Sequence, residues 1–121
     1  MGFKPAAANE VGTELYNQYR HLSATLLTDT GQVVLLLRNS PVQDATSSQL
    51  LRDIEFFQSQ ANSVHQTVSV GMLKQDLRHE VLRLRALLQG VTRTMQVSGQ
   101  VGRVAQRWEI VAKDLEDIGK L

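Results

Sequence analysis

The sequence predicts an all-α protein, folded as an antiparallel up-down-up-down four-helix bundle. Apolar residues recur every three or four residues in four separate segments, and short segments with proline or glycine lie between them. This spacing gives each helix one apolar line, and four such lines can bury one another. We expect a flexible N-terminal arm over residues 1–8 and a single helical-bundle domain over residues 9–121.

The first helix is predicted over about residues 9–38. A strand over 31–38 remains an alternative, because the run Val33–Leu37 is short, uniformly apolar and rich in β-prone residues. Asn39-Ser40-Pro41 ends the helix, since proline pushes the residue before it out of the α region. The apolar line consists of Leu15, Tyr19, Leu22, Leu26, Val33 and Leu37, with Asp29 or Thr30 at the missing position.

The second helix is predicted over about residues 45–69, beginning near Asp44 or Thr46. Thr46 and Gln49 have the spacing of a capping box, in which the two side chains bond to backbone N–H groups of the first turn. The apolar line has regular heptad spacing and consists of Leu50, Ile54, Phe57, Ala61, Val64 and Val68.

The third helix is predicted over about residues 73–97, after a corner at Gly71. This corner has no proline, so a helix running through Gly71 is the alternative. The end of the segment, residues 91–97, alternates between apolar and polar residues as a strand would. The apolar line consists of Leu77, Val81, Leu84, Leu88, Val91 and Met95.

The fourth helix is predicted over about residues 100–119, after a turn at Ser98-Gly99. Gly119 has the position beyond the last turn that commonly ends a helix. The apolar line has steps of three and four residues and consists of Val101, Val104, Trp108, Val111, Leu115 and Ile118.

Composition limits the class of protein. A chain of 121 residues can bury its own core, and the absence of cysteine excludes disulfides, thiolate metal sites and a cysteine nucleophile. No run approaches the roughly 18 apolar residues of a membrane span. We therefore expect a soluble, cytoplasmic protein; a periplasmic or secreted location stays open if a signal peptide has been removed.

No motif predicts catalysis, so we expect no enzyme activity, no cofactor and no metal. Asp76 and His79 resemble half of a di-metal carboxylate-x-x-His unit, but no second copy is present. Met72 and Met95 lie on apolar faces without a histidine opposite either of them, which gives haem little support. A metal- or haem-holding bundle is the second alternative function.

Nucleic-acid or anionic-surface binding is the first alternative. Residues 70–108 hold seven basic and two acidic residues, net +5, although the whole chain is only +1. Lys74, Arg78 and Arg85 fall within about 40° of one another on the third helix, and Arg93 lies further round. Against this function, no aromatic residues interleave with the arginines, and no helix-turn-helix pattern is present.

Several apolar residues lie off the four lines. Tyr16, Leu27 and Val34 form a second line on the first helix, which is either part of a broad core-facing stripe or an interface with another chain. Phe56 on the second helix and Leu82 on the third also lie off their lines. The leading prediction is therefore a non-catalytic helical protein–protein interaction module, such as an adaptor, a complex subunit or an oligomerising scaffold.

Overall fold

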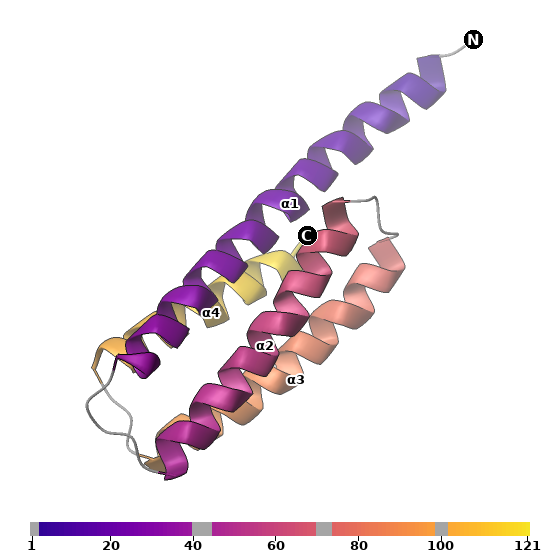
Figure 1. Ribbon diagram of the computed structural model, residues 1–121. Coiled ribbons are helices and arrows are strands. Elements are labelled where there is room, and N and C mark those ends of the chain that lie inside the picture. Colours follow the sequence, from indigo (N-terminus) through magenta and orange to yellow (C-terminus); the bar gives the residue numbers. More distant parts are fainter. Residues whose placement is uncertain (1–2, 40–44, 70–73, 99–101) are drawn as a thin grey trace.

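The computed structural model contains four α-helices (Figure 1). They are α1 (Phe3–Arg38), α2 (Ala45–Ser69), α3 (Lys74–Ser98) and α4 (Arg103–Gly119). The structure describes residues 3–39, 45–69, 74–98 and 102–121, with side chains for 14–39, 45–69, 76–97 and 102–121. The expected corners at Pro41, Gly71 and Gly99 lie outside the described residues, as do Met72 and Val101.

The all-α prediction is confirmed, and both segments with a strand alternative are helical. Residues 31–38 belong to α1 and residues 91–97 to α3. Gly31 lies inside α1, where a Cβ would meet only the side-chain amide of Gln58, 3.6 Å away. In each segment the helical periodicity of the whole stretch outweighs the β propensity of a few residues, because that propensity depends strongly on context.

Each helix packs against two neighbours, in the order α1, α2, α3, α4 and back to α1. Contacting pairs of α1 and α2 run in opposite chain order, as expected of antiparallel neighbours. Tyr16, early in α1, donates a hydrogen bond of 2.7 Å to the carbonyl of Ser69 at the end of α2. Arg38, at the end of α1, forms an ion pair with Glu55, nearer the start of α2. Figure 1 shows the chain running back and forth in this way.

The four predicted apolar lines form the core. All six residues of the α2 line are buried, and Thr30 fills the missing position of the α1 line with no exposed surface. On α1, Leu15 and Leu22 are partly buried; on α3 only Leu88 is partly buried, and on α4 only Val104. The lines bury one another because their spacing keeps each on one face of its helix.

Two aromatic residues join α2 to α4 in the middle of this core. The rings of Phe57 and Trp108 meet edge to face, with centroids 5.3 Å apart and planes at 69°. The indole Nε1–H of Trp108 donates a hydrogen bond of 3.0 Å to the Thr92 hydroxyl of α3. A buried tryptophan needs such a partner, and this bond fixes the indole between three helices.

The first helix begins earlier than predicted. It starts at Phe3 rather than near Asn9, so residues 3–8, expected to be a flexible arm, are helical. Ala6, Ala7 and Ala8 are strong helix formers, and Pro5 is tolerated because first-turn N–H groups have no intrahelical partner. The N-terminal part of α1 projects beyond the other helices in Figure 1.

Other helix ends also differ from the predictions. Gln49 donates its side-chain amide to Asp53 over 2.9 Å instead of closing a capping box with Thr46. Gly102 precedes α4 with a φ of 79°, a conformation that favours glycine. Gly119 is the last helical residue, and the right-handed helical Lys120 caps the end. None of the helices, over the described residues, has the length and hydropathy needed to cross a bilayer.

Candidate interaction site

The second apolar line of α1 packs against the core of the monomer. Val34 is only 4% exposed, and the partly buried Tyr16 and Leu27 pack against buried residues. The Tyr16 hydroxyl is bonded to Ser69, and the Arg20 guanidinium lies 5.8 Å from the Tyr16 ring centroid. Of the two sequence interpretations, the structure therefore matches the broad core-facing stripe, and Val34 is not available to a partner in this conformation.

Phe56 and Leu82, in contrast, are exposed. Phe56 is 52% exposed and Leu82 is 59% exposed. Phe56 borders a groove of about 320 Å³ between α2 and α3, whose lining surface is mostly apolar. A Cβ added to Gly90 would meet nothing within 4 Å, so the groove is open above this residue. The groove is lined by Asp53, Phe56, Ala86, Leu87, Gly90, Val91 and Thr94.

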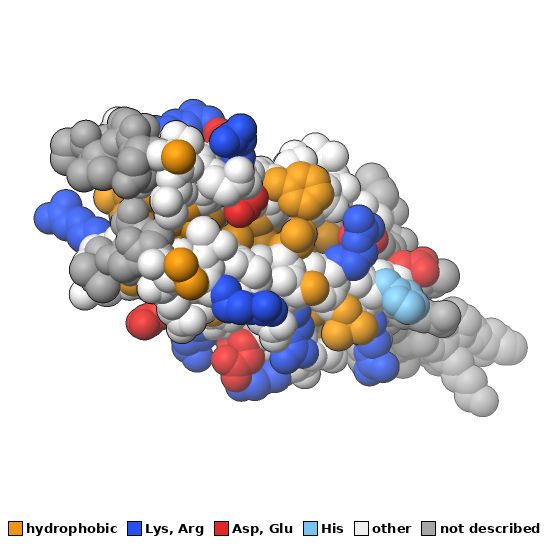
Figure 2. All heavy atoms as spheres, turned by 90° about the horizontal axis from the view of Figure 1, so that it is seen from below, with side chains coloured by type: hydrophobic (Ala, Val, Ile, Leu, Met, Phe, Trp, Pro, Cys, Tyr) orange, Lys and Arg blue, Asp and Glu red, His pale blue; other side chains and the backbone are white. Residues whose placement is uncertain are grey.

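The outer face of α3 continues this surface. Leu82, Ala86, Gly90 and Val97 are exposed and recur at steps of four, four and seven residues, which places them along one side of the helix. Val97 is 88% exposed, the largest fraction among the exposed large hydrophobic residues of the described chain. Figure 2 shows hydrophobic side chains along the middle of one face, with Lys and Arg side chains beside them.

Two arginines lie one helical turn from residues that line the groove, Arg52 four residues before Phe56 and Arg93 three residues after Gly90. Arg52 on α2 and Arg93 on α3 are exposed, and within the described residues neither has an ion pair. Asp53 is the acidic residue of the groove lining, and it accepts the hydrogen bond from Gln49. The borders of the groove therefore favour a negatively charged neighbour.

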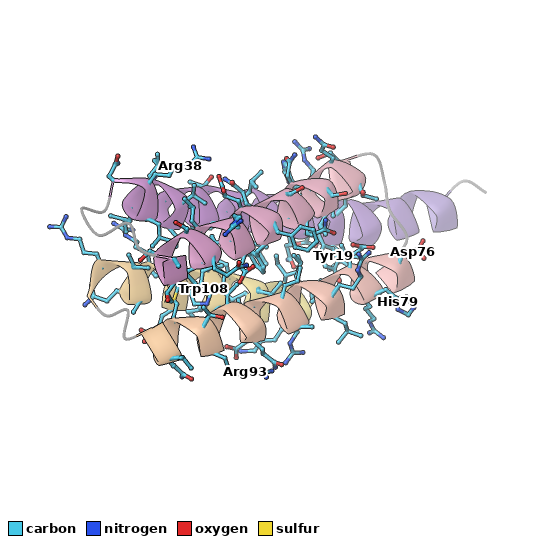
Figure 3. The ribbon with its side chains drawn as sticks, turned by 60° about the horizontal axis from the view of Figure 1, so that its bottom comes forward. Tyr19, Arg38, Asp76, His79, Arg93 and Trp108 are labelled. Atoms are coloured by element: carbon cyan, nitrogen blue, oxygen red, sulfur yellow. The ribbon has the colours of Figure 1, made fainter. Side chains whose placement is uncertain are left out.

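The predicted basic residues of α3 do not form one cluster. Arg78 and Arg85 line the same pocket, towards the C-terminal end of α4. Arg93 lies elsewhere on α3, about 22 Å along the helix axis from Arg78 at 1.5 Å per residue. Figure 3 shows Arg93 far from Asp76 and His79 along this helix. The Lys74 side chain lies outside the described residues.

The histidines show no ligand geometry. His79 is exposed on α3, while His65 lies 2.7 Å through Nδ1 from the buried Ser23 hydroxyl. Ser23 in turn donates to the Arg20 carbonyl at 3.1 Å, so the Nδ1–H tautomer of His65 completes the chain. Within the described part of the chain, no three His, Asp or Glu side chains are grouped so that they could hold a metal ion.

Sequence reasoning missed a carboxyl pair between α1 and α4. Burial, a hydrogen bond with Asp29 and repulsion from Asp29 and Asp117 raise the pKa of Asp114 to about 7. The Asp114 Oδ2 atom is buried. The spacing of α1 placed Asp29 near its apolar line, but no signal in the sequence shows that Asp114 lies opposite it.

Comparisons with known proteins found no matching family model, no matching curated protein and no matching solved structure.

Proposed function

We propose that this protein is a non-catalytic helical interaction module that binds an amphipathic helix of a partner protein in the groove between α2 and α3. The observation that carries the proposal is Phe56, which is 52% exposed beside a mostly apolar groove of about 320 Å³. Large aromatic side chains dominate binding energy at interfaces when a partner covers them.

The shape of the surface supports a helical occupant. Ala86 and Gly90 are small, so a helix laid along α3 can approach its backbone closely, with Leu82 at one end of the contact. A helix that binds in a groove contacts it through apolar residues three, four and seven positions apart in its own sequence. The exposed residues on α3 have a similar spacing. Such a helix would extend the bundle by packing as the existing helices do.

The charge of the surface supports an acidic partner. Arg52 and Arg93, each one helical turn from a residue that lines the groove, form no ion pair with a described residue. Rim charges of this kind accelerate association and select partners more than they strengthen binding. The proposed occupant is therefore an amphipathic helix with an apolar face and acidic residues on either side of it.

The test compares two exposed residues on opposite faces. Affinity capture with the wild-type chain identifies a partner, which is then purified and titrated against wild type, Phe56→Ser and Ile110→Ser. Ile110 is 41% exposed and lines a different pocket, with α1 and α4 residues. We expect Phe56→Ser to weaken binding at least about thirtyfold and Ile110→Ser to leave it unchanged.

Two results would overturn this proposal. One is equal affinity of the partner for wild type and Phe56→Ser. The other is a wild-type molar mass of two chains by light scattering that falls to one chain in Phe56→Ser, because the groove would then hold a second copy.

A further inference from the structure

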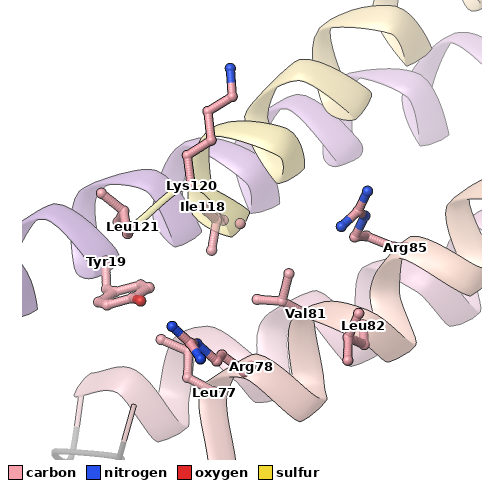
Figure 4. Close-up of a pocket in the computed structure, with 10 residues that line it drawn as sticks. Tyr19, Leu77, Arg78, Val81, Leu82, Arg85, Ile118, Lys120 and Leu121 are labelled. Carbon is pink, nitrogen blue, oxygen red and sulfur yellow. The ribbon is translucent and has the colours of Figure 1, made fainter. Parts of the chain in front are cut away.

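A second pocket lies at the other side of α3, between α1, α3 and the end of α4 (Figure 4). Its volume of about 290 Å³ is close to the lower end of the range for small-molecule sites. Apolar side chains make up much of the lining: Leu77, Val81, Leu82, Ile118 and Leu121. The remaining lining residues are Tyr19, Arg78, Arg85, Gly119 and Lys120.

Tyr19 brings a hydrogen-bond donor to this pocket. The residue is only 8% exposed, and its hydroxyl has no hydrogen-bond partner among the described residues. Burial raises the pKa of Tyr19, and the nearby positive charge of Arg78 lowers it. Figure 4 shows the hydroxyl directed towards Arg78. The hydroxyl is not among the buried side-chain atoms that lack a partner, so it reaches the accessible surface of the pocket and can donate a hydrogen bond to a ligand there.

Within the described part of the chain, no acidic side chain pairs with the two arginines of the pocket. Arg78 and Arg85 are exposed and form no ion pair with a described residue. Lys120 differs, because its ammonium lies 3.2 Å from Glu116, and Figure 4 shows it pointing away from the other lining residues. The Arg78 guanidinium and the Tyr19 hydroxyl are therefore the two donors that an anion in the pocket would meet.

We propose that this pocket binds a small amphiphile, an anionic carboxylate or phosphate group carried on a short apolar chain. The anionic group accepts hydrogen bonds from Tyr19 and Arg78, and the chain lies against Val81 and Ile118. Arg85 lies beyond Val81 in Figure 4 and adds attraction at longer range. The two pockets share no lining residue, and Leu82, at one end of the proposed partner contact, is the one residue that adjoins both proposed sites.

The first experiment titrates the full chain with four probes, followed by calorimetry and by amide chemical shifts. Octanoate and octyl phosphate carry both chemical parts, acetate carries only the anionic group, and octanol carries only the chain. We expect both amphiphiles to bind and to shift amides of residues 77–85 and 118–121, with acetate and octanol binding at least about tenfold more weakly. The affinities of the two amphiphiles show whether the site prefers a carboxylate or a phosphate.

The second experiment uses variants that retain the packing of the pocket. Tyr19→Phe removes only the hydroxyl, and Arg78→Met keeps an apolar stem without the charge. We expect each to weaken octanoate binding about tenfold or more, as for loss of a hydrogen bond to a charged group. Arg93→Met, at the distant position on α3, is the matched control and should bind as wild type does.

Three results would overturn the inference: no amphiphile binding at millimolar concentration, octanol binding as tightly as octanoate, or wild-type affinity in both Tyr19→Phe and Arg78→Met. Phe56→Ser should bind octanoate normally, which separates failure of this site from failure of the proposed partner groove.

Discussion

The helices α1 and α3 both carry apolar residues away from their main apolar lines, and two of these residues, Val34 and Leu82, have opposite surroundings. On α1, Val34 is 4% exposed, whereas on α3, Leu82 is 59% exposed. The difference follows from the neighbours. α1 makes extensive contacts with both α2 and α4, while α3 and α4 contact each other least among the adjacent pairs. Val34 is thus core because close neighbours cover its side of α1, although Leu35 beside it is 52% exposed, whereas Leu82 on α3 has no such cover.

The largest change in stability is expected when serine replaces an apolar residue off the main line on each of the two helices. Val34→Ser should lower the free energy of unfolding by about 2–4 kcal/mol, because it removes buried apolar surface and places a hydroxyl in the core. Leu82→Ser should change it by less than about 0.5 kcal/mol. Urea titrations followed by circular dichroism measure both. Similar losses in the two variants would show that the contrast between α1 and α3 is wrong.

A smaller change in the free energy of unfolding is expected at the contact between α3 and α4. Thr92→Val keeps the shape of the side chain but leaves the buried Trp108 N–H without its acceptor, which should cost about 1–3 kcal/mol. Thr94→Val is the matched control, because the Thr94 hydroxyl donates only to the Gly90 carbonyl, at 3.1 Å. Trp108 is the single tryptophan, so its fluorescence reports unfolding directly. Equal stability of the two variants would contradict the proposed role of this bond.

The smallest expected change in stability concerns a carboxyl pair at the contact of α1 with α4. The pKa of Asp114 is raised from 3.8 to about 7 in the folded chain. Between these values the folded state holds a proton that the unfolded state has released, so stability should fall as the pH rises from about 4 to 7. Asp114→Asn cannot ionise and should therefore lose less stability over this range. Solvent screening keeps the difference modest, because Asp114 is only partly buried.

Chemical denaturation at pH 5 and pH 8 measures this difference. Asp76→Asn, which changes an exposed aspartate on α3, serves as the control and should follow the wild-type pH dependence. If Asp114→Asn also follows it, the carboxyl pair does not contribute to the pH dependence of stability.

The candidate sites were only partly accessible from sequence. Helical spacing or charge identifies four candidate residues, all of which line or adjoin the two sites: Phe56, Leu82, Arg78 and Arg85. Spacing assigns Tyr19 only to the core line, because it places a residue on a face but says nothing about where its terminal hydroxyl points. The small residues Ala86 and Gly90 gave no signal of their own, since a groove exists only between two helices.

The sequence by itself determined the four helices and nearly all of their core residues. Its periodicity of three and four is a local property of the helix, so it can be read without knowing the neighbours. Only the tertiary structure decided that Val34 is buried, that Leu82 is exposed and that Asp114 meets Asp29. These outcomes depend on which helices are adjacent and how closely they approach. The spacing of apolar residues within one segment does not determine its distance from a segment far away in the chain.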